Sequence, residues 1–435
     1  MPTSVASPAA GTLPLPAVIP PPIRVAIPIP IRLQLPAAHL LRLPVAIRIL
    51  CALLVLLLAG LAVGDRPAAA QTMQLPERVP GDTVVTAVVP AAAFASDIGL
   101  MGAVAISRFR YHPMYSPFRS LTEIRLQAST KAYLELRVLY EHTETLGRPV
   151  RSRWTFNAER HPYDNFFGLG NSTEFSRDLW DDRFYFYDVM RLGFSWQGRH
   201  TLFRPQNSRA TLDLTGLAGI RYEQPVENQD NLINFDGPVG IEGGWTNRFG
   251  LGLIWENRDS EFAATRGNRL EIGGKWAPPF LFSDYPMALF EADARQFFTI
   301  PFPWIRPVLA MRLAGSHAFG TVPYWDMPHL GDERTLRGYP LYRFRGDAAL
   351  FYNVELRTWL YEHSYWDFKF GIQAFHDAGR VFTDEDRFSD IMRDHHRTFG
   401  GGVALALFTP DFILRFDAGF SDEMMRLYMN IGYMF

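Results

Sequence analysis

Apolar and polar residues alternate one by one along most of the chain after residue 83. In the segment 132–141, for example, Glu135 and Arg137 alternate with Leu134 and Leu136. A period of two places successive side chains on opposite faces of a β-strand, whereas a helix needs a period of about 3.6. The pattern therefore predicts an all-β protein in which each strand has one apolar face and one polar face.

Sixteen strands follow from this pattern, with turn-forming residues between them. They cover 84–94, 99–109, 121–129, 132–141, 151–160, 183–197, 210–222, 246–257, 269–276, 287–298, 305–317, 347–360, 366–377, 398–408, 412–420 and 425–435. No apolar stretch after residue 70 is long enough for a membrane-spanning helix, which needs about 20 residues. Two classes fit such strands: a soluble β protein, or an outer-membrane barrel whose apolar residues face lipid and whose polar residues face the lumen.

The lengths of the connections favour the barrel. If the last strand ends in the periplasm, the three longest connections, 161–182, 223–245 and 318–346, all lie on the extracellular side. The connections 361–365 and 409–411 are short and lie on the periplasmic side. Outer-membrane barrels have long extracellular loops and short periplasmic turns, and a soluble sandwich has no reason for this asymmetry. We therefore predict a transmembrane antiparallel β-barrel of sixteen strands, in the outer membrane of a Gram-negative-type bacterium.

A different pattern occupies the first 70 residues. Residues 1–46 are rich in proline and aliphatic residues, and Ile49–Val63 is apolar without interruption. This apolar run matches the core of a signal peptide, and Ala68-x-Ala70 suits signal peptidase. A single-pass anchor is the competing interpretation. We expect a Pro-rich leader and cleavable signal peptide in 1–70, a short periplasmic segment in 71–81 and the barrel in 82–435.

Composition, cysteine count and net charge limit the kinds of site and partner that the chain can have. The 435 residues are 48% hydrophobic, 14% aromatic and 20% charged, which is typical of an ordered chain with much apolar surface. The one cysteine, Cys51, lies in the leader, so the mature chain can form no disulfide. Loss of the leader removes five Arg and one Asp from 43 basic and 45 acidic residues, which leaves a net charge of −6. This charge gives no support for nucleic acid as a partner.

The connection 318–346 contains the segment Leu336-Arg337-Gly338-Tyr339. Loops longer than about 12–15 residues without secondary structure are usually functional or disordered. On the strand that follows this loop, alternation places Asn353, Glu355 and Arg357 on the polar face. On the next strand Asp377 lies on the corresponding face. If both polar faces line the lumen, Glu355 and Asp377 point inward from neighbouring strands.

Arg337 is the candidate partner for these two carboxylates. Its guanidinium has a planar fork of donors that can bridge two carboxylates at once. If the loop folds into the lumen, Arg337 can contact Glu355 and Asp377 together, and Gly338 permits the close turn. A solvated loop arginine is the competing interpretation.

The last predicted strand carries an apolar residue at every second position: Leu427, Met429, Ile431, Tyr433 and Phe435. An apolar stripe that ends on a C-terminal aromatic residue is typical of the insertion signal read by the bacterial barrel-assembly machinery. We expect Tyr433 and Phe435 to belong to this signal, which makes that machinery a partner for the chain's own insertion. An ordinary amphipathic strand is the alternative.

Four motifs make the chain resemble the Omp85 superfamily, also called the bacterial surface antigen or BamA/TamA family, over most of residues 80–435. Leu336-Arg337-Gly338-Tyr339 resembles the family's Arg-Gly-aromatic loop motif, and 346–357 resembles the strand that follows it. Phe375-His376-Asp377-Ala378-Gly379 is similar to the family's Phe-x-Asp-x-Gly strand motif. Residues 256–267 resemble the family's periplasmic turn, although Ala264 stands where a proline is usual.

The resemblance implies a lumen plugged by an inward-folded extracellular loop. Its latch would consist of Arg337, Gly338, Tyr339, Glu355 and Asp377, and the strand motif of Phe375 and Gly379. It implies a role in outer-membrane biogenesis, by insertion or translocation of protein or lipid. Partners would then include outer-membrane lipid and either a periplasmic partner or an unfolded outer-membrane protein. Family members with this role carry periplasmic POTRA domains before the barrel, and 71–81 has room for none, so a passive pore or structural barrel is the alternative.

Other segments give little support for catalysis or a cofactor. His395-His396, with His376 and Asp394, is the candidate metal site, but alternation places His376 on the lipid-facing side. Neither a Gly-x-Ser-x-Gly elbow nor a P-loop occurs, and the scattered Ser, His and Asp residues form no recognisable triad. Some outer-membrane barrels are phospholipases or proteases. We nevertheless expect no enzyme activity, no metal and no cofactor.

Overall fold

The computed structural model describes residues 83–95, 99–112, 115, 118–145, 149–226, 230–363, 368–384, 386, 388–406 and 413–435. The predicted leader in 1–70 and the predicted periplasmic segment in 71–81 lie outside the described residues. Of the predicted periplasmic turns, residues 364–365 of 361–365 and the whole of 409–411 also lie outside them.

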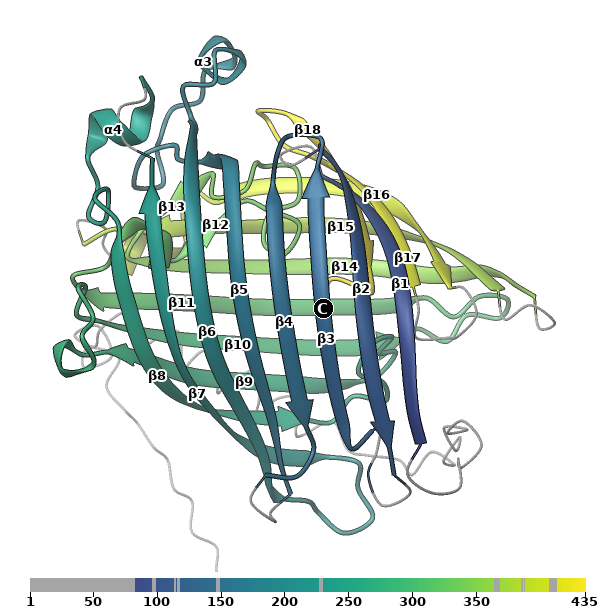
Figure 1. The fold of residues 1–435 in the computed structure, drawn as a ribbon. Helices are drawn as coiled ribbons and strands as arrows, with labels where there is room; N and C mark the ends of the chain where they lie inside the picture. The colour runs from purple at the N-terminus through teal and green to yellow at the C-terminus, as the bar shows by residue number, and fades with distance from the viewer. Residues whose placement is uncertain are drawn as a thin grey trace, which may run out of the picture. The chain divides into compact units, whose positions relative to one another are not determined.

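Sixteen strands of the described part of the chain form one closed antiparallel barrel (Figure 1), which confirms the predicted fold class. They are β1 (Thr83–Ala95), β2 (Gly99–Tyr111), β3 (Ser120–Ser129), β4 (Leu134–His142), β5 (Val150–Asn165), β6 (Phe186–Phe203), β7 (Thr211–Pro225), β8 (Gly244–Glu256), β9 (Gly267–Ala277), β10 (Met287–Thr299), β11 (Val308–Gly320), β14 (Ala348–His363), β15 (Phe368–Phe382), β16 (His396–Ala406), β17 (Ile413–Phe420) and β18 (Met425–Ile431). Each predicted strand overlaps one of these, in the predicted order.

The barrel closes through an unusually short seam between its first and last strands. β1 pairs with β2 along the whole of Thr83–Ala95. Against β18 it forms two residue pairs, Phe94 with Met429 and Ala95 with Tyr428. By comparison, β17 and β18 pair throughout Met425–Ile431.

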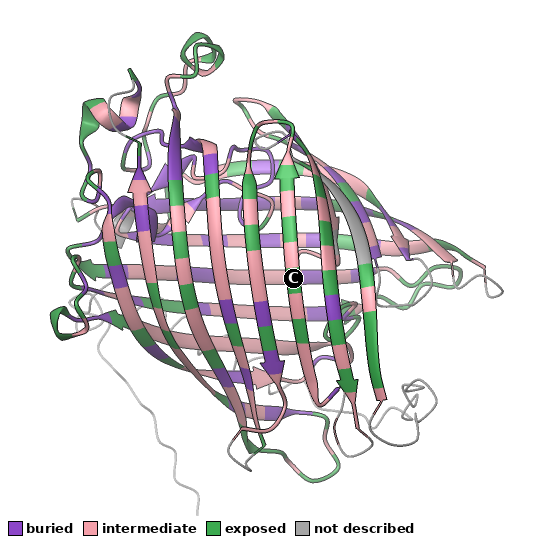
Figure 2. Cartoon of the chain, in the orientation of Figure 1, coloured by how far each residue is buried: buried purple, intermediate pink, exposed green. Residues whose placement is uncertain are grey.

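The alternation in sequence becomes an outer and an inner surface of the barrel. On β15, Gln373, Phe375 and Asp377 are buried on the lumenal face, whereas Ile372 and Ala374 are exposed on the outer face. Exposed residues recur along the strands that face the viewer in Figure 2. This arrangement places apolar side chains toward lipid and polar side chains toward the lumen, as a membrane barrel requires.

Short helices interrupt two long connections at the end of the barrel shown uppermost in Figure 1. α3 (Arg177–Asp181) begins after Ser176, whose side chain accepts a hydrogen bond from the Leu179 amide at 3.4 Å. α4 (Leu232–Asp236) is capped in the same way by Asn231. Each α-helix in the described residues has five residues, and none is long and apolar enough to cross a membrane.

Several predicted strand boundaries are wrong, and two of these differences have a clear cause in the backbone. The strand predicted to begin at Arg183 begins at Phe186, because Arg183 adopts a left-handed conformation with φ of 65°. The strand predicted to run to Phe435 ends at Ile431, and Gly432 has φ of 85°. Because the chain turns at Gly432, Phe435 leaves the apolar stripe on the outer face of β18. It is 7% exposed and packs with Phe297 and other inward-facing residues.

Candidate functional site: a lumenal loop held by buried charges

The connection between β11 and β14, residues 321–347, folds against the inner surface of the barrel. We call it the lumenal loop. It contains the 3-10 helix η2 (Tyr324–Asp326) and a two-stranded sheet of β12 (His329–Leu330) and β13 (Phe344–Arg345). Four apolar residues of the loop form one buried cluster with four residues of β11, β14 and β15: Leu330, Leu336, Tyr339 and Phe344 with Ala314, Ala349, Phe351 and Val381. The loop therefore lies in the lumen, as predicted for the fold.

Local hydrogen bonds shape the segment that presents Arg337. The Asp332 carboxylate accepts hydrogen bonds from the backbone amides of Arg334 at 2.8 Å and Thr335 at 2.7 Å. The Thr335 hydroxyl in turn accepts one from the Gly331 amide at 2.9 Å. Such side-chain-to-backbone bonds are how aspartate and threonine fix tight turns. The turn brings Leu336 and Arg337 onto the barrel wall.

Arg337 contacts both carboxylates that strand alternation selected. Its Nε and Nη2 donate to the two oxygens of Asp377, each at 2.9 Å. Its Nη1 donates to Glu355 Oε2 at 2.9 Å. The backbone amide of Arg337 adds a further bond to Asp377 at 3.2 Å. The side chains of Arg337 and Asp377 are fully buried, so this is a lumenal ion-pair centre and not a solvated arginine.

The centre extends beyond these three residues. The Phe375 ring lies under the guanidinium, with 3.4 Å between the Arg337 Cζ and the ring centroid. Asn353 Nδ2 donates to Asp377 at 2.9 Å and to the Thr335 carbonyl of the loop at 2.7 Å. Asp377 therefore accepts hydrogen bonds from Arg337 of the loop, from Asn353 of β14 and, at 3.5 Å, from the Thr398 hydroxyl of β16, which together fix its carboxylate.

Asp417 on β17 supplies a third carboxylate, which sequence reasoning missed. Its Oδ2 lies 3.8 Å from Arg337 Nη1 and 2.9 Å from Arg415 Nε. The alternation of β17 puts Arg415 and Asp417 on the inner face, so the parity of that strand could have identified both. With Arg357 beside Glu355 at 3.6 Å, three arginines face three carboxylates, and the buried charges balance.

Burial and the neighbouring carboxylates shift the pKa of Arg337 in opposite directions. Burial favours the neutral guanidinium, but the charges of Asp377 and Glu355 outweigh this and hold the pKa of Arg337 above its ordinary value. The guanidinium therefore stays charged. A buried ion pair can stabilise only when the surrounding hydrogen bonds are nearly complete, and here the guanidinium is met by two carboxylates and an aromatic face.

Gly338 and Tyr339 attach the loop to the last hairpin of the barrel. The Gly338 amide donates to the Tyr428 hydroxyl at 3.3 Å, and the Ser421 hydroxyl donates to the Gly338 carbonyl at 3.0 Å. The Tyr339 hydroxyl donates to the Asp422 carboxylate. Gly338 has φ of 120°, and a Cβ at this position would lie 2.9 Å from the Phe420 backbone. The motif therefore needs glycine both for its backbone angle and for space.

Glycines of the barrel wall make room for the loop. A Cβ added to Gly419 would lie 2.6 Å from the Arg337 carbonyl carbon, and one added to Gly400 would lie 2.4 Å from the Phe375 ring. Both positions are at the contact between the wall and the ion-pair centre. Backbone and ring atoms, and not flexible chain ends, would have to move.

We expect Gly419→Ala to destabilise the folded barrel by about 1–3 kcal/mol, the usual cost of overpacking. Urea unfolding in detergent micelles followed by tryptophan fluorescence measures this loss. The matched control is Gly102→Ala, because Gly102 also lies in a barrel strand but has open space around an added Cβ. Equal stability of the two variants would show that the loop does not press against Gly419.

Two further buried arginines hold the part of the loop that follows Tyr339, and sequence reasoning missed them. Arg343 Nη2 donates to Glu423 at 2.7 Å and to the Thr173 carbonyl, in the β5–β6 connection, also at 2.7 Å. The Arg345 guanidinium stacks on Tyr342 at 4.1 Å and donates to the Tyr324 carbonyl. The Glu423 carboxylate lies 80 residues away in the chain, and the Thr173 and Tyr324 partners are backbone carbonyls, so no spacing in the sequence indicates these contacts.

The remaining predicted residues lie outside the ion-pair centre. Gly379 pairs with Phe351 on β14, and a Cβ there would lie 2.6 Å from Phe351 Cβ. It lets Phe351 pack under the loop. Tyr433 is turned inward, with its ring 3.9 Å from the Arg357 guanidinium carbon. Tyr433 and Phe435 therefore do not share a face with Leu427 and Met429 in the folded chain, and their place in the insertion signal stays a prediction.

The histidines considered for a metal site have separate partners. His396 stacks on Phe344 at 3.7 Å and contacts the Asn171 carbonyl at 2.9 Å. His395 contacts the Ile391 carbonyl at 2.7 Å, and His376 contacts the Tyr352 hydroxyl at 3.3 Å. Among the described residues, no group of three or more His, Cys, Asp and Glu is placed to hold a metal ion.

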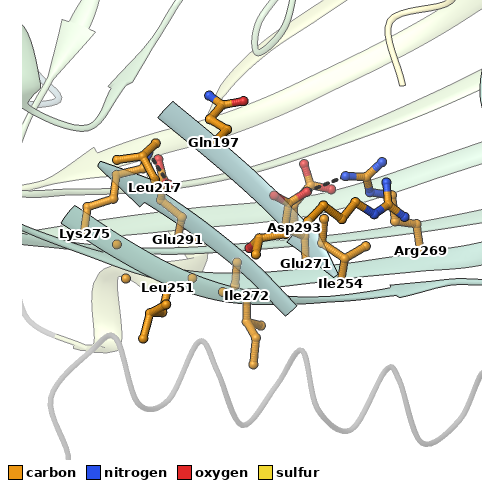
Figure 3. Close-up of a pocket in the computed structure, with 18 of the residues that line it drawn as sticks. Gln197, Leu217, Leu251, Ile254, Arg269, Glu271, Ile272, Lys275, Glu291 and Asp293 are labelled. Carbon is orange, nitrogen blue, oxygen red and sulfur yellow. Dashed lines mark hydrogen bonds and ion pairs between the residues drawn. The ribbon is translucent and has the colours of Figure 1, made fainter. Parts of the chain in front are cut away.

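Beside the loop, the lumen keeps a cavity of about 580 Å³, lined mainly by strands from β4 to β11. Several of its charged residues pair across neighbouring strands, as Lys275 does with Glu291 at 2.6 Å. Figure 3 shows Asp293 near Arg269 in this lining, while Leu251 and Ile272 extend from the other face of their strands. The loop therefore fills one side of the lumen and leaves a polar space on the other.

An antiparallel barrel with an apolar outer surface, a charged lumen and an inward-folded loop defines an outer-membrane β-barrel. The Omp85 superfamily domain matches residues 122–435, so the chain belongs to this superfamily. The predicted family and the outer-membrane location are thus confirmed.

Solved structures agree with this assignment at the level of the fold. The crystal structure of BamA from Haemophilus ducreyi lacking POTRA domains 1-3 is 14% identical, with 80% of this chain and 74% of that chain covered and a TM-score of 0.52. CdiB from Escherichia coli is 11% identical, with 80% and 67% covered and a TM-score of 0.55. None of the curated proteins compared with the chain matches it in sequence.

Proposed function

We propose that this protein inserts or translocates protein or lipid at the outer membrane by opening the seam between β1 and β18. The observation that carries the proposal is the pairing of these strands. Two residue pairs join β1 to β18, whereas β17 joins β18 along its whole length. Each backbone hydrogen bond contributes about 0.5–1.5 kcal/mol net, so the seam is the least costly place to part the wall.

The lumenal loop has a supporting role in this proposal. Gly338 and Tyr339 bind the β17–β18 hairpin, while Arg337 binds β14 and β15. The loop thus ties the strand at one edge of the seam to the rigid wall. A latch of Arg337, Gly338, Tyr339, Glu355 and Asp377 would hold the loop in the lumen, so that the pore stays closed while the wall opens at the seam. No enzymatic step is needed, and the substrate would come from a periplasmic partner or as an unfolded outer-membrane protein.

A disulfide across the seam tests the proposal. With Phe94→Cys and Met429→Cys at a paired position, and Cys51 replaced by serine, the oxidised protein should fail to restore the outer-membrane protein profile of depleted cells. Reduction should restore the function. The matched control joins β9 to β10 through Leu270→Cys and Ala294→Cys, which are also paired, and should function in both states. Full function of the oxidised seam variant would contradict the proposal.

A passive pore is the second candidate, and the polar cavity beside the loop favours it. Quantitative outer-membrane proteomics after depletion separates the two. Loss of assembly activity should lower the abundance of other barrels, whereas loss of a passive pore should leave them at normal levels and change only solute uptake.

A further inference from the structure

The turn between β10 and β11 exposes large apolar side chains. Residues 300–307 read Ile-Pro-Phe-Pro-Trp-Ile-Arg-Pro. Trp304 is 89% exposed and Phe302 is 54% exposed, and both isoleucines are exposed as well. The β6–β7 turn at the same end of the barrel is polar by comparison, with Gln206, Asn207 and Ser208 at its tip. Exposed apolar patches of this kind mark contact with a protein or a membrane.

The backbone of this turn has few amide donors that would lose hydrogen bonds to water in an apolar environment. Pro301, Pro303 and Pro307 have no backbone amide hydrogen, so fewer donors lose hydration when the turn enters an apolar phase. The Ile300 amide donates to the Pro307 carbonyl at 2.8 Å and closes the turn at its base. The aromatic rings of Phe302 and Trp304 lie 6.4 Å apart. The turn is therefore a compact apolar projection.

Position and charge point to lipid as the partner. On β10, Phe290 and Phe298 lie on the lipid-facing side, and Ile300 continues this row into the turn. The exposed surface of the turn is thus continuous with the membrane-facing wall. Arg306 is exposed beside the aromatic residues, and the described part of the chain gives it no ion pair. Tryptophan and arginine together suit the headgroup level of a bilayer, where the ring is half apolar and the guanidinium meets phosphate.

We propose that residues 300–307 form a membrane anchor that enters the phospholipid interface on the periplasmic side of the outer membrane. Phe302 and Trp304 sit among the upper acyl chains, and Arg306 contacts lipid phosphate. The anchor lies on the wall formed by β10 and β11, away from the β1–β18 seam. It sets the depth of this wall independently of whether the seam opens.

An environment-sensitive nitrobenzoxadiazole label on Ile305→Cys tests the anchor and keeps both aromatic residues in place. Cys51 is the one native cysteine, and Cys51→Ser makes labelling specific. The protein is reconstituted in vesicles of phosphatidylcholine and phosphatidylglycerol, and the label is quenched by doxyl-labelled lipid or by aqueous iodide. An Asn207→Cys label in the polar turn is the matched control.

We expect doxyl lipid to quench the label at position 305 severalfold more strongly than the label at position 207, and iodide to show the reverse order. Adding Phe302→Ser and Trp304→Ser should make the label at position 305 accessible to quenching by iodide. Equal quenching of the two positions by iodide would overturn the proposal. Protection of position 305 that arises only when periplasmic extract is added would also overturn it, because it would assign the turn to a protein partner.

Discussion

Replacing Arg337 with alanine should destabilise the barrel by about 3–5 kcal/mol, the usual cost of removing one partner from a buried ion pair. The variant leaves Glu355 and Asp377 buried with their main cation gone, and it removes the guanidinium that lies on Phe375. Urea unfolding in detergent micelles measures the loss, and the temperature at which the folded band disappears on gels should fall in parallel.

Two variants make this result specific. Arg334→Ala removes an arginine of the same loop whose side chain is 78% exposed, and it should change stability by less than about 1 kcal/mol. Arg337→Lys keeps the charge but cannot form the two-pronged contact with Asp377, so its stability should fall between wild type and Arg337→Ala. If Arg337→Ala and Arg334→Ala were equally stable, the ion-pair centre would have no structural importance.

The second large effect is expected in single-channel recordings. Wild-type barrels in planar bilayers should show a small and fluctuating conductance, because the lumenal loop occupies one side of the lumen. Arg337→Ala should raise the mean conductance severalfold, since the loop loses its attachment to β14 and β15 and leaves the pore. Arg334→Ala serves as the control here too and should resemble wild type.

This recording distinguishes release of the lumenal loop from unfolding of the barrel. A variant that unfolds gives no channels at all, whereas a variant with a released loop gives larger ones. Unchanged conductance in folded Arg337→Ala barrels would mean that other contacts, such as Arg343 with Glu423, suffice to hold the loop in the lumen. The plug would then not depend on the latch.

The strands and half of the ion-pair centre could be predicted because both follow from alternation. A barrel wall separates lipid from a polar lumen, so each strand must alternate, and the same parity placed Glu355 and Asp377 on the inner face. Asp417 follows the same rule, but the motif residues after the loop lie on β14 and β15 and give no sign that β17 contributes a carboxylate. Its strand lies elsewhere in sequence but adjoins β16 in the barrel.

The C-terminal segment and the second half of the loop could not be predicted in this way. The inward turn before Tyr433 depends on the left-handed conformation of Gly432, and a period-two pattern continues through a glycine without any sign of a bend. Phe435 then finds an apolar site against Phe297 inside the barrel. Arg343 binds the Glu423 carboxylate and the Thr173 carbonyl, and Arg345 binds the carbonyls of Tyr324 and Asn165. Backbone carbonyls carry no sequence signature, and Glu423 lies 80 residues away in the chain.

A double-mutant cycle between Arg337→Ala and Asp377→Asn tests the central claim most directly, namely that the loop is tied to the barrel wall through this pair. Unfolding free energies are measured for wild type, both single variants and the double variant under the same conditions. Direct contact predicts that the double variant is more stable than the sum of the single losses allows, by a coupling energy of about 1–3 kcal/mol. Strictly additive losses would contradict the account, because they would mean that Arg337 and Asp377 act independently.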